Sequence, residues 1–480
     1  MPKVDHGLDE AKSLTGGLAA SSSKSRRFPQ AASLIWGILL MTNATSVIPE
    51  SYTLMKDMGQ GAVASGWVIG CGWALQALTV AAMQCFAQKL SYAGKRALIV
   101  VAALVFAASN LAFAVAADPP GWWHDPSDGK RLVCIILARL AAGPCAGVGL
   151  FITALSVDIT PRSEMVPYSV WRMCGATVGV GFGPILSSAS QHILNANGVR
   201  ARAAAPGYVL AFVYVAFAVV LCSWLPMDLE PLLEAKREED DAKSQAGTQK
   251  AAQEFEVADL STATRVKLWK SGLYYGVERA FIVSMLESAT AFVLQQEFGW
   301  STRDSGYAVG IAFLGSVPLT LAANVVKQRG WTTDLGLMFA SVLVCAASTV
   351  LLFPQLAFAS GVYILLVADG LIFSTGYLAN GVFTGLALKS SMPGTKYTVD
   401  NYIFIGEALQ NTCARLLAPA IARLVLDDYG RGVYAAFQLA TSVLGFVTCV
   451  SVRRSILADR DAARISLPHA QSGPERLPNS

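Results

Sequence analysis

Four charged residues of this 480-residue chain lie inside long apolar stretches, where a charge needs a chemical reason. Arg139 stands in LARLAAGPCAGVGLF, residues 137–151, which has no polar face of the kind a soluble helix would need. Arg172, Asp369 and Glu407 have comparable surroundings. A charge at mid-bilayer costs about 2.5 to 3.5 kcal/mol on insertion scales and must face protein or a wet cavity. The four residues therefore predict an internal polar site.

Composition favours a membrane protein. The chain is 54% hydrophobic and only 15% charged, which leaves too little polarity for a soluble surface. Apolar stretches of about 20 residues, long enough to cross a bilayer, recur along it. We place these stretches at 30–52, 63–87, 97–117, 132–157, 168–190, 207–226, 270–295, 305–326, 335–354, 359–388, 400–425 and 432–452.

Short basic loops predict the orientation, because Lys and Arg favour the cytoplasmic side. Arg200 and Arg202 disagree, but the other clusters fall on one side, so we expect cytoplasmic tails over 1–29 and 453–480. The clusters are Lys89, Lys95 and Arg96 after the second span, Lys327 and Arg329 after the eighth, Lys389 and Lys396 after the tenth, and Arg453 and Arg454 after the twelfth.

Residues 227–266 are polar and acidic and predict a flexible cytoplasmic linker. Within them, Asp228, Leu232 and Leu233 have the spacing of an acidic dileucine sorting signal for endosomal or vacuolar membranes. The alternative is that the two leucines dip into the membrane interface beside the sixth span.

An internal repeat divides the chain into two six-helix bundles, over 30–226 and 267–452. The sequence SGWVIG at residues 65–70 recurs as SGYAVG at 305–310, an offset of 240 residues. Similar offsets elsewhere support a duplicated unit. We therefore expect an all-α membrane protein with twelve transmembrane helices in two pseudo-repeats.

The repeat pairs Arg139 with Asp369, at an offset of 230, and Arg172 with Glu407, at an offset of 235. We hypothesise that all four line a cavity, where the arginines attract an anion and the carboxylates pair with them when it is absent. A poorly solvated carboxylate can also take up a proton. The alternative is that the pairs are structural locks between helices.

Two further residues are candidates for the cavity. Glu287 lies nine residues from Glu278 on one predicted helix, so the two acids occupy opposite faces and at most one faces a cavity. We choose Glu287 for a coupling or gating role. Asn43, beside Thr42 and Thr45, offers uncharged donors to a ligand, although hydrogen bonds between helices explain these residues as readily.

In these motifs the chain resembles the major facilitator superfamily over about residues 30–455. The resemblance implies two bundles around a midplane site that opens to each side in turn. The departures are Ala87, where a glycine is usual, and Ser91, where an acid is usual. Besides Arg139, the residues that carry the resemblance have expected gating or packing roles. They are Gly143 and Gly147, Gly179 with Gly183 and Pro184, and Gly94, Lys95 and Arg96; Pro419 repeats Pro184 in the second half.

Within the superfamily, the chain resembles the branch that contains the lysosomal protein linked to neuronal ceroid lipofuscinosis and the vacuolar phosphate carriers with an SPX domain. The resemblance rests on residues 414–419, on 428–430 and on Leu286, Glu287 and Ser288. It favours an endolysosomal or vacuolar membrane, with the plasma membrane as the alternative.

Other chemistry has little support in the sequence. All nine cysteines fall in predicted spans and the four histidines do not form a cluster, so we expect no disulfide framework, metal site or cofactor. The chain has no catalytic motif, and its net charge of +4 fits membrane orientation rather than nucleic-acid binding. We expect a monomer in a lipid bilayer.

The favoured function is secondary transport of a small organic or inorganic anion, coupled to protons or to exchange. The alternatives are a passive anion channel on the same fold, a carrier of neutral or cationic compounds, and a receptor or scaffold without transport.

Overall fold

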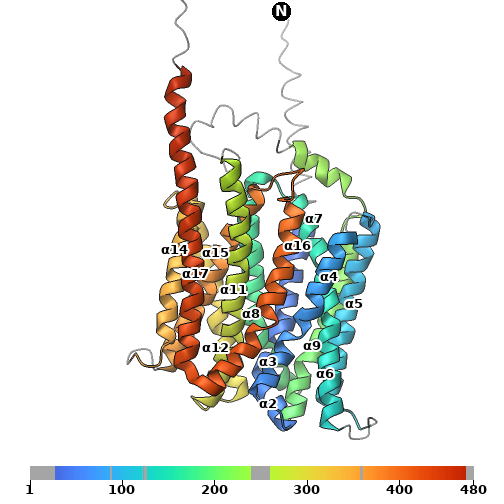
Figure 1. Ribbon diagram of the computed structural model, residues 1–480. Coiled ribbons are helices and arrows are strands. Elements are labelled where there is room, and N and C mark those ends of the chain that lie inside the picture. The colour runs from blue at the N-terminus through green and yellow to red at the C-terminus, as the bar shows by residue number, and fades with distance from the viewer. Residues whose placement is uncertain are drawn as a thin grey trace, which may run out of the picture.

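The computed structural model describes residues 27–86, 89–121, 123, 127–238, 240, 260–356 and 361–471, and every regular element in these residues is a helix. The helices run roughly along one direction (Figure 1). The N-terminal and C-terminal halves of the chain lie side by side, as the sequence repeat predicts, and α8 and α16 stand where they meet.

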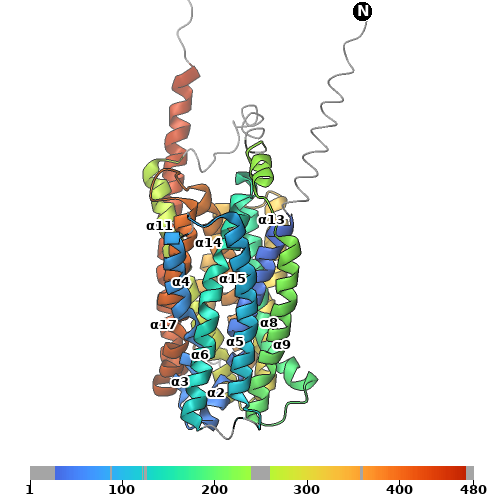
Figure 2. The same cartoon turned by 90° about the vertical axis from the view of Figure 1, so that its right-hand side faces the viewer.

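In the N-terminal half, α5 and α6 pack against each other, and each also packs against a further helix of the half. In Figure 2, α4, α6, α5 and α9 form one face, and α5 packs against both α6 and α9. The half consists of a helix over residues 27–45, α2 (Ile48–Asp57), α3 (Ala62–Gly70), α4 (Gly72–Phe86), α5 (Tyr92–Ala117), α6 (Asp128–Val148), α7 (Leu150–Asp158), η1 (Arg162–Glu164), α8 (Met165–Ile193) and α9 (Val199–Trp224).

The C-terminal half repeats this pattern with α11 and α15 at its centre, because α11 packs against α15 and α17, and α14 packs against both α15 and α17. Its elements are α11 (Thr262–Gln296), α12 (Thr302–Leu314), α13 (Ser316–Gln328), α14 (Asp334–Ser348), η3 (Thr349–Leu352), α15 (Val362–Lys389), α16 (Val399–Leu409), the π-helix η5 (Gln410–Arg415) and α17 (Ala418–Gln471).

Side-chain caps begin several of these helices. A Ser or Thr oxygen accepts a hydrogen bond from a backbone N–H of the first turn, which would otherwise have no partner. The sequence therefore fixes these starts locally. The capping residues are Ser91, Ser261, Ser301, Thr333 and Thr398.

In the described residues, nine helical stretches are long and apolar enough to cross a membrane. The last of them, residues 399–462, covers two predicted spans, and its path turns at Gly430, whose φ of 78° is not helical. Helices α8 and α11, with 29 and 35 residues, lie outside the nine because their sequences hold more polar and small residues. The chain is a multi-pass membrane protein, and the count of twelve spans stays a prediction.

The predicted linker is not flexible throughout. Residues 230–238 form a helix on the same end of the bundle as the starts of α11 and α16, which we call the linker end (Figure 1). Lys236 Nζ donates to the carbonyl oxygen of Asp158 at 2.6 Å and so fixes this helix to the end of α7. Leu232 is 4% exposed and packs in the core of the N-terminal half. Residues 241–259 lie outside the described residues.

Glycines hold the helices of the N-terminal half close together. A Cβ on Gly179 would collide with the carbonyl oxygen of Ile38, and one on Gly183 would collide with the hydroxyl of Thr45. Gly143 and Gly147 of α6 face α4 in the same way. Small residues let helix backbones approach closely where the bilayer supplies no hydrophobic drive for association.

Thermal stability tests this packing. Gly179→Ala should lower the melting midpoint of the detergent-solubilised protein, because overpacking costs about 1 to 3 kcal/mol. Gly37→Ala is the matched control, since a Cβ there meets nothing within 4 Å and alanine is the better helix former. Equal midpoints for the two variants would contradict the packing role of Gly179.

Candidate functional site

A cavity lies between the two halves, reached by side chains from both. Six elements of the two halves supply most of its walls, and four of its lining residues are charged. The lining residues are Ser33, Trp36, Gly37, Leu40, Met41, Ala146, Gly149, Leu150, Thr153, Arg172, Met173, Ala176, Arg279, Tyr377, Asn380, Thr384, Tyr402, Ile403, Gly406, Glu407, Gln410 and Arg415.

Two arginines of the C-terminal half share one tyrosine in this cavity. The guanidinium carbon of Arg279 lies 4.3 Å from the ring centroid of Tyr377, and Arg415 Nη2 donates to the Tyr377 hydroxyl at 3.1 Å. Arg279 Nη2 also donates to Gln410 Oε1 at 2.9 Å, and the Arg415 guanidinium carbon lies 4.8 Å from the ring centroid of Trp73. We call Arg279, Tyr377 and Arg415 the arginine clamp.

The π-helix η5 explains how Gln410 and Arg415 reach the same cavity. Leu416 N–H donates to the carbonyl oxygen of Asn411 at 3.0 Å, a bond between residues five apart. In an α-helix of 3.6 residues per turn, residues five apart would point about 140° away from each other. A π turn brings them onto one face, and such turns occur frequently at functional sites.

The positive charge of the cavity is not neutralised by direct pairing. Arg279 and Arg415 are each 4% exposed, and Arg172 is half-buried. Among the described residues, no carboxylate oxygen lies within 4.0 Å of these three guanidinium groups. Arg279 Nε and Nη1 are buried with no hydrogen-bond partner. Glu407 is the one carboxylate in the lining, so three cations face one anion.

Arg139 does not line this cavity. Its guanidinium is 6% exposed and donates to the carbonyl oxygens of Asn43 and Ala44, at 3.1 and 3.4 Å. The helix over residues 27–45 ends here, before Pro49 at the start of α2, so these carbonyls lie in its last turn. A cation suits the negative end of a helix. The sequence hypothesis paired Arg139 with Asp369, but in the described residues Arg139 donates instead to two backbone carbonyls, and its Nε has no hydrogen-bond partner.

Asp369, Glu287 and Asn43 are buried and are not among the residues that line the cavity. Asp369 Oδ2 accepts a hydrogen bond from the Thr290 hydroxyl at 2.6 Å, within the C-terminal half. Glu287 is 5% exposed, and its Oε1 has no partner. The backbone carbonyl of Asn43 accepts from Arg139, while the neighbouring Thr42 hydroxyl donates to Gly179 of α8.

Contacts between the halves close the linker end of the cavity. A Cβ on Gly385 of α15 would lie 2.6 Å from the Cα of Val166 in α8, so these two helices are in close contact. The ring centroids of Phe151 and Phe404 are 6.4 Å apart. Gln84 Nε2 donates to Asn401 Oδ1 at 3.0 Å, between α4 and α16.

A second set of contacts closes the opposite end. Gln295 Nε2 donates to the carbonyl oxygen of Pro49 at 3.0 Å, and the rings of Tyr52 and Phe292 meet edge to face at 5.1 Å. The predicted packing residues Pro184 and Pro419 also lie here, because their carbonyl oxygens approach Gly306 of α12 and Gly66 of α3. Both sets of contacts cross between the halves.

The motif at residues 94–96 uses hydrogen bonds where the family pattern has charge. The Gly94 N–H donates to the Ser91 hydroxyl, so Ser91 serves as a helix cap instead of an acid. Lys95 Nζ lies 5.6 Å from the Phe151 ring centroid, and Arg96 donates to the carbonyl oxygen of Cys222 at 2.6 Å. Ala87, the other departure from the pattern, lies outside the described residues.

The sequence prediction omitted the arginine clamp from the site. Arg415 stands mid-way along the predicted span 400–425, so the rule that singled out Arg139 applies to it equally. Arg279 adjoins Glu278 and is an intramembrane charge of the same kind. No sequence signal predicts the π-helix that turns Gln410 and Arg415 together.

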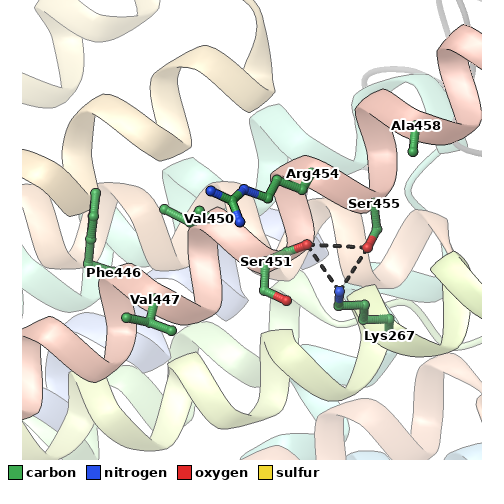
Figure 3. A pocket seen from close by; sticks show the side chains of 8 residues that line it. All are labelled: Lys267, Phe446, Val447, Val450, Ser451, Arg454, Ser455 and Ala458. Atoms are coloured by element: carbon green, nitrogen blue, oxygen red, sulfur yellow. Dashed lines mark hydrogen bonds between the residues drawn. The ribbon is translucent and has the colours of Figure 1, made fainter.

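A second hollow lies on the outside of the C-terminal half, between α11 and α17 (Figure 3). Lys267 Nζ donates there to the Ser451 carbonyl oxygen at 3.1 Å and to the Ser455 hydroxyl at 2.8 Å. Arg454, Val447 and neighbouring residues of α17 complete it. Only one half forms this groove, so it is not a path between the halves.

The described residues contain no group of three or more His, Cys, Asp or Glu side chains that could hold a metal ion. The nine cysteines are all free thiols.

A family model described as Major Facilitator Superfamily matches residues 32–398, and the chain belongs to this family. No curated protein sequence matches it. Membership of this family points to a transporter rather than an enzyme.

Three solved structures of one E. coli protein, the xylose transporter XylE, show the same fold. The partially occluded inward-open conformation gives a TM-score of 0.63 at 11% identity, covering 88% of this chain and 98% of that chain. The proton:xylose symporter bound to 6-bromo-6-deoxy-D-glucose gives 0.62 at 12%, covering 89% and 95%. The inward-open conformation gives 0.57 at 12%, covering 87% and 94%.

Thermal stability distinguishes an arginine that joins helices, such as Arg139, from one that lines the cavity, such as Arg172. Arg139→Met should lower the melting midpoint of the ligand-free protein, because hydrogen bonds to a charged group contribute about 1.5 to 3 kcal/mol. Arg172→Met should leave it nearly unchanged, since Arg172 is half-buried at the cavity. If both variants melt alike, Arg139 is not a structural lock.

Proposed function

We propose that this protein is a secondary transporter that carries an anion across the membrane by alternating access. The observation that carries the proposal is the charge of the cavity, which is lined by Arg172, Arg279 and Arg415 against the single carboxylate of Glu407. Buried charges need partners, and an uncompensated guanidinium in a low-dielectric site attracts an anion strongly.

The geometry of the arginine clamp supports the same choice. Aromatic rings and neutral oxygens hold the two guanidinium groups in place, which leaves N–H donors of Arg279 without a partner. A bound carboxylate or phosphate can accept these donors in pairs, the geometry that guanidinium groups favour.

Alternating access rests on the two sets of contacts between the halves. Breaking the contacts at the linker end, around Gly385 and Phe404, opens the cavity to that side. Breaking those around Gln295 and Tyr52 opens it to the other. Rocking of one bundle against the other exchanges the two arrangements.

We further propose that transport is coupled to protons, and we assign the coupling to Glu287. Its carboxyl is nearly fully buried on the central helix α11, and one of its oxygens has no hydrogen-bond partner. A proton taken up there neutralises a charge that would otherwise be costly to bury. Glu407, inside the cavity, then balances the arginines when no substrate is bound.

Cytoplasmic tails and an endolysosomal or vacuolar membrane also remain proposals. The basic loops support the orientation, and resemblance to the lysosomal and vacuolar branch supports the membrane. The dileucine motif does not support this location, because Leu232 packs in the core of the N-terminal half and is not accessible to a sorting adaptor.

Uptake into proteoliposomes tests the main proposal. Anions supplied singly (chloride, phosphate, acetate and benzoate) should include at least one whose uptake saturates. Arg279→Gln and Arg415→Gln should each lower that uptake about ten- to a hundredfold, the loss expected for a hydrogen bond to a charged group.

The matched control is Arg454→Gln, which removes a guanidinium from the exposed groove on α17. It should leave uptake unchanged. Absence of uptake for every anion, or equal loss in all three variants, would contradict anion transport through the cavity. Flux that does not saturate would instead indicate a passive channel.

Coupling is tested by an imposed pH gradient. Wild-type uptake should rise when the gradient drives protons in the direction of transport, and Glu287→Gln should abolish that rise while keeping uptake by exchange. Glu278→Gln is the control, because Glu278 is equally buried but faces Gly445 of α17. A Glu287→Gln protein that still responds to the gradient would exclude this residue as the coupling group.

A further inference from the structure

The two walls of the cavity differ in chemistry. Of the twelve lining residues in the N-terminal half, nine are apolar or glycine; of the ten in the C-terminal half, eight carry polar or charged side chains. The sequence hypothesis gave both cations to the N-terminal half, whereas two of the three lining arginines belong to the C-terminal half and Arg172 is the one charged residue of the N-terminal wall. A ligand that fills the space therefore touches a charged wall on one side and an apolar wall on the other.

The polar wall fits a single acidic group. Arg279 and Arg415 are fixed on Tyr377, through the ring face and the hydroxyl respectively. Both guanidinium groups therefore lie within reach of one small anion placed beside that tyrosine. Asn380 Oδ1 has no hydrogen-bond partner either, so this wall also offers an acceptor.

The apolar wall fits a hydrocarbon body. Leu40 and Met41 of the first helix, with Leu150 of α7 and Ala176 of α8, present no polar atom able to bind an inorganic oxyanion. Trp36 adds a flat indole face, whose Nε1 has no hydrogen-bond partner, and Gly149 is required beside it because a Cβ there would collide with the indole. Apolar cavity surface favours a ligand that displaces water with its own apolar atoms.

We infer that the anion is an organic carboxylate with an apolar body, rather than chloride, phosphate or another inorganic ion. This inference rests on the proposed function and names the substrate class of the same cavity. The carboxylate binds at the arginine clamp of the C-terminal half, and the hydrocarbon part lies against Leu40 and Met41 of the N-terminal half. Each ligand thus touches both halves, as a substrate that links their movement must.

Ligand-induced thermal stabilisation of the purified full-length protein tests the inference. The probes are chloride, phosphate, acetate, butyrate, benzoate and 3-phenylpropionate, each titrated to find the concentration for half-maximal effect. That concentration should fall about fourfold for each methylene group buried, so 3-phenylpropionate acts at far lower concentration than acetate. Benzamide, which keeps the ring but not the charge, should have no effect.

Substitutions test separately what each wall of the cavity contributes to ligand-induced stabilisation. Met41→Gln should remove most of the advantage of 3-phenylpropionate over acetate and leave the effect of acetate unchanged. Arg279→Gln should weaken both ligands alike. Met227→Gln makes the same chemical change at an exposed position outside the cavity and should alter neither.

The outcomes distinguish failure of the organic-acid inference from failure of the proposed anion transport. Phosphate or chloride that stabilises as well as 3-phenylpropionate, with loss in Arg279→Gln, would overturn the organic-acid inference and leave anion transport standing. Equal effects of all carboxylates regardless of size would overturn it too. If no anion stabilises the protein and benzamide does, the proposed function fails as well.

Discussion

Every charge that this chain buries between its helices must find its partner inside the protein, because the hydrocarbon of the bilayer offers none. Helix ends supply many of these partners. Arg131 donates to the carbonyl of Ala117 at the end of α5, Arg431 to that of Leu352 at the end of η3, and Arg139 to Asn43 and Ala44. In each case a guanidinium satisfies carbonyls that the helix itself leaves free. These arginines are structural.

The arginine clamp differs from these arginines in its partners and in lining the cavity between the halves. Arg279 and Arg415 lie against aromatic rings and donate to neutral side-chain oxygens, and Arg279 Nε and Nη1 have no hydrogen-bond partner. Such an arrangement is costly unless a ligand completes it. The π-helix at Gln410–Arg415 also indicates a functional site. Its irregular turn replaces regular α-helical hydrogen bonds and places two polar side chains in the same cavity.

The sequence predicts the helices well because apolar length and Ser or Thr caps are local properties. The two-bundle division also follows from it, since the repeated SGWVIG and SGYAVG segments lie at matching places of the halves. The assignment of Arg139 to the cavity illustrates the limit. Intramembrane charge indicates that a residue needs a partner, but a sequence does not show where a neighbouring helix breaks and offers its carbonyls. For the same reason it does not show which face Arg415 takes after a π turn.

The most direct measurement is an experimental structure of the protein with 4-bromobenzoate, in which the anomalous signal of bromine locates the ring. We expect the carboxylate beside Tyr377, with guanidinium nitrogens of Arg279 and Arg415 within hydrogen-bond distance, and the bromine against Leu40 and Met41. A carboxylate bound to Arg139 instead, or a bromine position outside the cavity between the halves, would contradict it.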